Sequence, residues 1–122
     1  MGTVQSYEGR REGMQPYLQI DRAVQHIKQH FRENIAIGDL AKLVKLSVRQ
    51  LNRKFRQTLN SSPQAFIVKT RIQAACELLR SSDHAIGEIA LDLGFYDQSS
   101  FSQQFRKHMG ATPLRYRRRF RS

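Results

Sequence analysis

The sequence repeats itself once, and this internal repeat restricts the possible folds more than any other feature of the chain. Residues 37–41 (IGDLA) match residues 86–90 (IGEIA) at an offset of 49 positions. Further along, the offset becomes 50, and the matched positions are Leu51, Phe55, Arg56, Leu59, Pro63 and Phe66 with Phe101, Phe105, Arg106, Met109, Pro113 and Tyr116. The extra residue of the second copy falls in a predicted turn, where insertions are tolerated. The repeat therefore predicts two copies of one small structural unit.

Each copy has the pattern of two short helices joined by a tight turn. In the second copy, residues at helical spacing form an apolar face, namely Ile86, Ile89, Ala90 and Leu93. Gly94 predicts the end of this helix, because glycine enters the left-handed conformation without a Cβ clash. Asp97 can cap the next helix, which we expect to stop at Gly110. Its predicted buried stripe consists of Phe101, Phe105 and Met109. This arrangement is typical of a helix-turn-helix motif.

The signals at the helix ends agree with this division. Ser47 can cap the second helix of the first copy, with Gln50 placed to complete a capping box. Both copies end in a hydroxyl residue followed by proline, at residues 62–63 and 112–113, which predicts helices that begin with proline. A helix over residues 63–80 would be roughly 27 Å long at ~1.5 Å per residue. That length is comparable with the ~34 Å that separates successive major-groove faces of DNA.

We therefore expect an all-helical chain. The predicted parts are a disordered leader or linker at residues 1–16, a first helix-turn-helix subdomain at 17–62, a linker helix at 63–80, and a second helix-turn-helix subdomain with a basic tail at 81–122.

Charge is distributed unevenly along the chain. The formal net charge is +11, and residues 40–76 contain eight Lys or Arg and no acidic residue. Residues 98–122 contain seven Lys or Arg and again no acidic residue. Both windows cover or follow a predicted turn and helix, which favours a polyanionic partner over an ordinary solvated basic surface.

A helix that enters the major groove of DNA needs a face opposite its buried side that can reach base edges. In the first copy this face predicts base contacts from Arg49, Asn52 and Arg53. The offset of 50 gives Ser99, Ser102 and Gln103 in the second copy. Arginine suits guanine and an amide side chain suits adenine, so we expect the first copy to supply more of the discrimination. The residues that we expect to contact phosphates are Lys54, Arg56, Arg106, Lys107 and Arg117.

Other reactive residues fit bland roles better. The single cysteine, Cys76, lies in the predicted linker helix, fits a reducing cytosol and suits a buried position. His26 and His30 lie one helical turn apart, but no third ligand accompanies them, so a solvated pair is favoured over a metal site. No catalytic cluster or glycine-rich phosphate loop occurs, and we expect neither an enzyme nor a cofactor. No apolar run is long enough to cross a bilayer.

The second copy resembles the signature of AraC/XylS-type bacterial transcription regulators. The matching pattern is Ile86-x-x-Ile89-Ala90-x-x-x-Gly94-Phe95-x-x-x-x-x-Phe101-Ser102-x-x-Phe105-Arg106-Lys107-x-x-Gly110-x-x-Pro113-x-x-Tyr116-Arg117. Residues 71–79 resemble the linker helix of that family, and the likeness covers about residues 18–120. Two residues depart from the family pattern: Lys45 stands where glycine is common in the first turn, and Gln103 stands where many members carry arginine.

The resemblance implies a DNA-binding domain of seven helices. It implies two recognition helices in adjacent major-groove segments of an asymmetric promoter site, and contact with RNA polymerase when the regulator activates. The family's base-contacting positions map onto the same six residues that helical spacing selects, which are Arg49, Asn52, Arg53, Ser99, Ser102 and Gln103. Members often carry an N-terminal effector-binding and dimerisation domain, which is not visible in this chain, whereas some members stand alone at about this length. The leader is compatible with an excised C-terminal domain, which is the favoured interpretation.

The sequence thus predicts a cytoplasmic, nucleoid-associated transcription regulator that binds double-stranded promoter DNA by its sequence, without cofactor, metal or membrane. Two alternatives remain. A non-specific nucleic-acid compactor or RNA-binding protein would use the charge, although the aromatic residues lie at predicted buried positions instead of forming stacking platforms. A helical adaptor for an acidic protein would leave the duplicated exposed stripes without a purpose.

Overall fold

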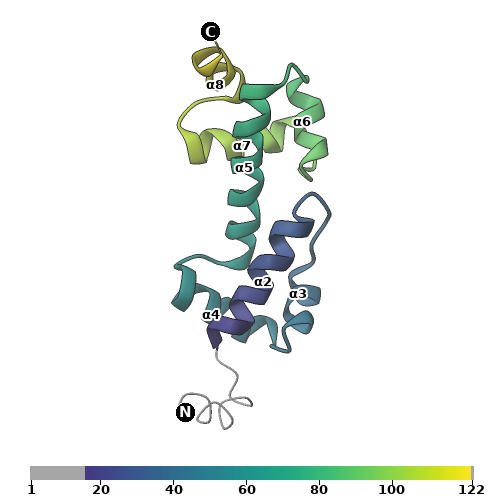
Figure 1. Ribbon diagram of the computed structural model, residues 1–122, viewed down its shortest axis with the longest axis vertical. Coiled ribbons are helices and arrows are strands. Elements are labelled where there is room, and N and C mark those ends of the chain that lie inside the picture. The colour runs from purple at the N-terminus through teal and green to yellow at the C-terminus, as the bar shows by residue number, and fades with distance from the viewer. Residues whose placement is uncertain (1–15, 122) are drawn as a thin grey trace, which may run out of the picture. The chain divides into compact units, whose positions relative to one another are not determined.

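The computed structural model describes residues 16–121, which form seven α-helices and no strand (Figure 1). The helices are α2 (Pro16–His30), α3 (Ile37–Leu43), α4 (Val48–Leu59), α5 (Pro63–Ser81), α6 (Ile86–Asp92), α7 (Gln98–Met109) and α8 (Pro113–Phe120). The all-helical prediction is confirmed. The predicted leader lies outside the described residues, apart from Pro16. None of the described helices has both the length and the apolar character needed to cross a bilayer.

The described residues group into two compact units. The first unit comprises residues 16–29 and 35–64, and the second comprises residues 30–34 and 65–121. Helix α5 therefore lies almost entirely within the second unit, together with the short segment that follows α2. The predicted division into a helix-turn-helix subdomain at 17–62, a linker helix at 63–80 and a second subdomain at 81–122 stays a prediction.

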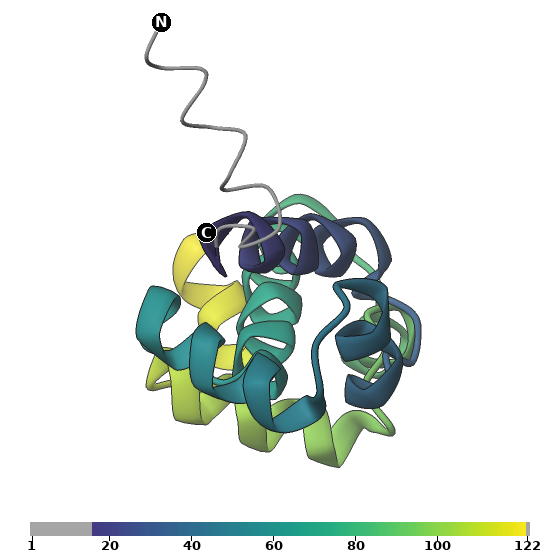
Figure 2. The ribbon, with the colours of Figure 1, turned by 90° about the horizontal axis from the view of Figure 1, so that it is seen from below.

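The first unit is built from α2, α3 and α4 (Figure 2). Its buried apolar residues recur at helical spacing on each helix and are Ile20, Ala23, Ile27, Leu40, Ala41, Val44, Leu51 and Phe55. A long-range hydrogen bond ties the start of α2 to the turn after α3, because the Gln19 amide donates to the Val44 carbonyl at 3.0 Å. Because α4 packs against the core through Leu51 and Phe55, its opposite face is turned to solvent.

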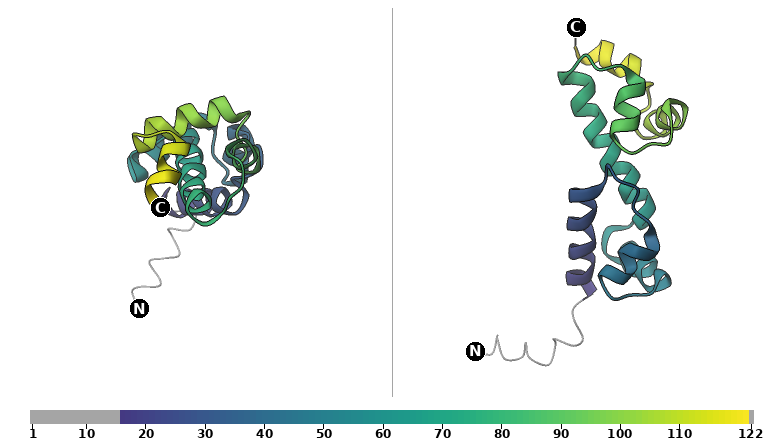
Figure 3. Two further views of the ribbon diagram at one scale, coloured as in Figure 1. Left: turned by 90° about the horizontal axis from the view of Figure 1, so that it is seen from above. Right: turned by 90° about the vertical axis from the view of Figure 1, so that its right-hand side faces the viewer.

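In the second unit, α7 lies against α6 and α8, as the left panel of Figure 3 shows. A series of aromatic rings in contact runs from its core to its surface, with centroid separations of 5.0, 5.7, 5.4 and 4.6 Å. Phe95, Phe101, Phe105 and Tyr116 are buried, whereas Phe120 at the end of the series is 53% exposed. Phe101 and Phe105 are fully buried, as predicted. The prediction for Met109 is wrong, because its side chain is 40% exposed. This residue ends α7, and the chain turns away at Gly110 before Pro113 fills the core.

The repeat of the sequence is also a repeat of the structure. Residues 51–65 and residues 101–115 have the same class of burial at every matched position. The capping box at Ser47 is confirmed. The Ser47 hydroxyl accepts from the backbone N–H of Gln50 at 3.1 Å, and the backbone N–H of Ser47 donates to the side-chain oxygen of Gln50 at 2.9 Å. Asp97 caps α7 by accepting from the Ser100 amide at 2.8 Å, also as predicted.

The two turns have the same backbone geometry. In the first, the Lys45 amide donates to Lys42 and the Leu46 amide donates to Ala41, which is the Schellman pattern of a helix end. Gly94 and Phe95 repeat this pattern in the second turn. The residue in the left-handed conformation is Lys45 (φ 59°) in one turn and Gly94 (φ 95°) in the other. A lysine there costs about 1 kcal/mol relative to glycine.

Tyr96 is the extra residue that changes the offset of the repeat. Phe95 matches Leu46 at the earlier offset, and Asp97 matches Ser47 at the later one, so one residue is inserted between them. The Tyr96 side chain is 88% exposed. The turn thus absorbs the insertion without disturbing the buried positions on either side.

Candidate nucleic-acid interface

Helix α4 presents a polar stripe on the face opposite its buried side. Leu51 and Phe55 face the core, whereas Arg49 and Arg53 are exposed and Asn52 is half-buried. Spacings of three and four residues bring the side chains at 49, 52 and 53 together on one face. Among the described residues, these three side chains have no hydrogen-bond or ion-pair partner. Their donors are therefore available to a ligand.

Helix α7 presents the equivalent stripe in the second unit. Ser99 and Gln103 are exposed, and Ser102 is half-buried, opposite the buried Phe101 and Phe105. Within residues 16–121, the side chains of the three polar residues are likewise without a hydrogen-bond partner. Each stripe lies within a single unit, so every predicted base-contacting residue is brought beside the other two of its own helix.

The two stripes differ in charge. Helix α4 carries four cationic side chains along its length, which are Arg49, Arg53, Lys54 and Arg56. Helix α7 has no charged residue in its first two turns, and its cationic residues begin at Arg106. A phosphate backbone would therefore be attracted along the whole of α4 but only to the last turn of α7.

The residues predicted to contact phosphates fall into two groups. Arg56, Arg106 and Lys107 are exposed and Lys54 is half-buried, and their charges have no partner in the described part of the chain. Arg117 differs, because its guanidinium donates to the Leu79 carbonyl at 3.2 Å and to the Ser82 carbonyl at 3.0 Å. Arg117 therefore has a structural role, because it donates hydrogen bonds to carbonyls at the end of α5 that have no partner within the helix. Its contact with phosphate stays a prediction.

Arg121 and Arg80 strengthen the same corner of the second unit. Arg121 donates to the Ser82 carbonyl at 2.7 Å and pairs with Asp83 at 2.7 Å. Its hydrogen bond and its charge lower the pKa of Asp83. Arg80 donates to the Tyr116 hydroxyl at 2.6 Å. Burial raises the pKa of Tyr116, so this hydroxyl stays protonated.

Sequence reasoning missed the part that Arg71 plays in the structure. This residue of α5 is only 9% exposed, and its guanidinium donates to the Phe31 carbonyl at 2.7 Å and to the Glu33 carbonyl at 2.9 Å. The guanidinium carbon lies 5.8 Å from the centre of the Phe95 ring. Burial lowers the pKa of Arg71. No local signal in the sequence indicates this buried role, because the carbonyls that Arg71 reaches are 38 and 40 residues away.

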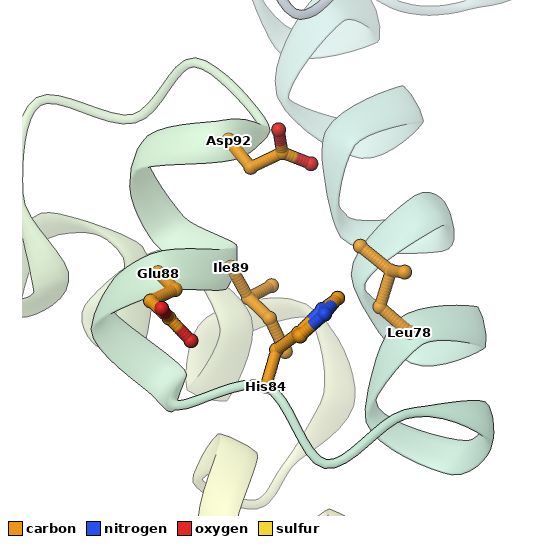
Figure 4. A pocket seen from close by; sticks show the side chains of 5 residues that line it. All are labelled: Leu78, His84, Glu88, Ile89 and Asp92. Atoms are coloured by element: carbon orange, nitrogen blue, oxygen red, sulfur yellow. The ribbon is translucent and has the colours of Figure 1, made fainter.

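A cavity of about 260 Å³ lies between α5 and α6 and is lined by Leu78, His84, Glu88, Ile89 and Asp92 (Figure 4). Both carboxylates already have partners: Glu88 accepts from the Ala85 amide at 3.0 Å, and Asp92 pairs with Arg32 at 3.3 Å. Residues 16–121 contain no group of three or more His, Cys, Asp or Glu side chains that could hold a metal ion. The cavity therefore does not compete with the two stripes as a functional site.

Comparison with known proteins gives a consistent result. Residues 40–119 match the family described as "Helix-turn-helix domain". The C-terminal domain of AraT, a response regulator from Geobacillus stearothermophilus, is 34% identical, with a TM-score of 0.81 over 85% of this chain and 87% of that domain. The DNA-binding domain of the global transcriptional factor AdpA, solved in complex with a target DNA, is 28% identical, with a TM-score of 0.78 over 82% of this chain and 90% of that one.

Among curated proteins, the transcriptional activator RhaS of Salmonella schwarzengrund is 36% identical over 87 residues, which is 71% of this chain. The match covers 31% of RhaS, so the chain spans about a third of the length of such relatives. The fold and these matches define a helix-turn-helix protein of the DNA-binding class. More specifically, the chain belongs to the AraC/XylS family of transcription regulators and corresponds to their DNA-binding domain.

Proposed function

We propose that this protein binds double-stranded promoter DNA by its sequence, with α4 and α7 inserted in adjacent major-groove segments of an asymmetric site. The observation that carries the proposal is the pair of exposed polar stripes, each on the second helix of a helix-turn-helix unit and each backed by the same pattern of buried residues. AdpA, a structural neighbour at 28% identity, was solved with its target DNA, which supports the same use of this fold.

The proposed base contacts come from six side chains. Arg49 and Arg53 can each make a bidentate contact to guanine, and Asn52 can do the same to adenine. In the second unit, Gln103 suits adenine, whereas Ser99 and Ser102 can bond to either kind of base edge. Each good bidentate pair contributes about 1–3 kcal/mol of discrimination against the wrong base. We therefore assign most of the specificity to the first unit.

The proposed phosphate contacts set affinity and orientation. They come from Lys54, Arg56, Arg106, Lys107 and Arg117. Charge on these side chains adds binding energy without distinguishing sequences, and it makes affinity fall as salt rises. For Arg117, a phosphate contact would have to be compatible with its two bonds to the carbonyls of Leu79 and Ser82.

The activity of the whole regulator is a further part of the proposal. The relative RhaS is named a transcriptional activator, and we infer an activating role with contact to RNA polymerase at the promoter. Because the match covers 31% of RhaS, we also infer that an effector-binding or dimerisation domain accompanies this domain in such regulators. A protein with this activity would work in the cytoplasm, in association with the nucleoid.

The deciding experiment is selection from a pool of random duplexes at near-physiological salt, followed by sequencing of the bound fraction. We expect an asymmetric motif with two blocks about one helical turn (~10 bp) apart. A single block would remove base recognition from α7. Retention without enrichment of any sequence, lost steeply as salt rises, would instead identify a non-specific nucleic-acid binder and overturn the proposal.

A further inference from the structure

Lys45 has a backbone conformation that lysine rarely adopts. Four of the described residues have a left-handed φ, and the other three are Gly94, Gly110 and Asn60. Glycine has no Cβ to clash, and asparagine tolerates this conformation better than other residues with a side chain. Lysine has neither advantage. A residue held in such a conformation is a reason to look for a function that requires its side chain.

Packing within the protein does not account for this lysine. Its side chain is exposed, and among residues 16–121 its ammonium group has no hydrogen-bond or ion-pair partner. The matching position of the second unit is Gly94, where a Cβ would lie 2.9 Å from the Arg32 carbonyl oxygen and 3.0 Å from the Arg71 guanidinium. Glycine is therefore required in one turn, whereas the other turn has space for a side chain and contains a charged one.

The surroundings of Lys45 are basic. Lys45 lies two residues before Ser47, which caps the N-terminus of α4. It is therefore close to the end of α4 at which Arg49 lies. Lys42 lies in the last turn of α3, three residues earlier. No acidic residue occurs between positions 40 and 76. Three cations, Lys42, Lys45 and Arg49, thus lie close in sequence to the start of the proposed recognition helix.

The second unit shows how the same turn looks without this charge. The residues that match Lys42, Lys45 and Arg49 are Leu91, Gly94 and Ser99, all of them uncharged. Since the turns have equal backbone hydrogen bonds, the fold does not need the cations. The three cations therefore distinguish the first turn from the second without a role in the fold.

We propose that the Lys45 ammonium contacts a DNA phosphate at the edge of the groove entered by α4. This inference rests on the proposed function and adds a contact that helical spacing does not predict, because Lys45 is in the turn and not on the helix. An ammonium group is a compact point charge that binds phosphate without reading the base. The residue would hold α4 in register, at the cost of a strained backbone.

The test separates backbone strain from DNA binding. In Lys45→Gly, thermal unfolding should shift upward by a few degrees, since glycine relieves the left-handed strain. Affinity for the selected duplex should fall by up to about tenfold at ~0.1 M salt, and the slope of log K against log salt should lose about 0.9. Lys45→Arg should keep the slope of the wild-type protein.

Asn60→Gly is the matched control, because it relaxes the left-handed residue at the other end of α4 without removing charge. It should leave the salt slope unchanged. If Lys45→Gly is folded and its slope equals that of the wild type, Lys45 does not contact phosphate and the inference is wrong. A wild-type protein that binds no duplex would instead overturn the proposed function itself, so the two failures are distinguishable.

Discussion

Two glycines of the second unit share a left-handed backbone but differ in their surroundings. Gly94 is enclosed, with the Arg32 carbonyl oxygen and the Arg71 guanidinium at the distance of a clash from any added Cβ. Gly110 ends α7 with nothing within 4 Å of that position. The two residues therefore separate the cost of the backbone conformation from the cost of steric overlap.

We expect Gly94→Ala to lower the free energy of unfolding by about 3 kcal/mol, because alanine meets both the left-handed penalty and a backbone carbonyl that cannot move freely. Gly110→Ala is the control and should cost only about 1 kcal/mol, the conformational part. Urea unfolding followed by circular dichroism measures both. Equal losses in the two variants would show that the contact of Gly94 with Arg32 and Arg71 has no energetic importance.

Asp83 offers a prediction of pH dependence at the same scale. The Arg121 guanidinium lowers the pKa of this carboxyl, which means that the folded protein favours the ionised form. The stabilising effect of the pair is therefore complete above the ordinary pKa of about 4 and is lost as pH falls through the lowered pKa. Because Asp83 is exposed, the effect on stability is small, and titration is the sharper measurement.

Titration of the Asp83 carboxyl by carbon NMR should give a midpoint below its ordinary value. In Arg121→Ala the midpoint should rise toward that value. Arg119→Ala is the control, because Arg119 has no partner among residues 16–121. A midpoint that is the same in wild type and Arg121→Ala would mean that the pair does not persist in solution.

At the scale of the helices, sequence alone was sufficient to predict most of α4 and α7. The period of apolar residues predicted the buried side of both helices, and Ser47, Asp97 and Gly110 predicted the start of α4 and both ends of α7. These features depend on interactions between residues close in the chain. Helical spacing then selects the exposed stripes, whose contacts with DNA stay predictions.

Sequence could not predict contacts that depend on tertiary packing. Arg117 was predicted to contact phosphate, and Arg71 was noted only within the linker-helix pattern. Each of them donates two hydrogen bonds to carbonyls more than thirty residues away. No periodicity indicates which carbonyl a long side chain will reach. The prediction that Met109 is buried was wrong for a related reason, because the helical period of apolar residues does not show where the core ends.

The proposed contacts of α4 lead to a prediction about specificity. Arg53→Ala should relax the base preference at one position of the first block and cost about 1–3 kcal/mol on the selected duplex, because a bidentate contact to guanine is lost. The measurement is a repeat of the duplex selection with the variant, and an unchanged sequence motif would contradict the assignment. Lys107→Ala provides the contrast: it should weaken binding to all sequences alike and lower the salt slope by about one.

At the scale of the whole molecule, the two units present different polar side chains on their stripes. The first unit carries two arginines and an asparagine in its stripe, and the second carries two serines and a glutamine. Specific affinity should follow this inventory, because each of the three side chains of the first unit can make a bidentate base contact, whereas in the second unit only the glutamine can. The difference can be measured without changing the protein.

We expect a duplex with only the α4 block intact to keep more of the specific affinity than one with only the α7 block intact. Fluorescence anisotropy with the intact site, the two half-scrambled sites and a fully scrambled site measures this in one experiment. Equal losses from the two half-scrambled sites would show that the stripe of α7 contributes as much as the stripe of α4. The fully scrambled duplex gives the non-specific baseline.

The identical burial of residues 51–65 and 101–115 has a consequence for how such a protein can change. The buried side chains that pack each helix against its unit are separate from the side chains that face outward. The outward side chains can therefore be substituted together without changing the core. A chain carrying Ser99→Arg, Ser102→Asn and Gln103→Arg would display the α4 stripe twice. If the proposed base contacts are correct, both blocks of its preferred site should then carry the same bases. Gene duplication followed by substitution on the outward face alone would thus be enough to give two copies of one unit different preferences.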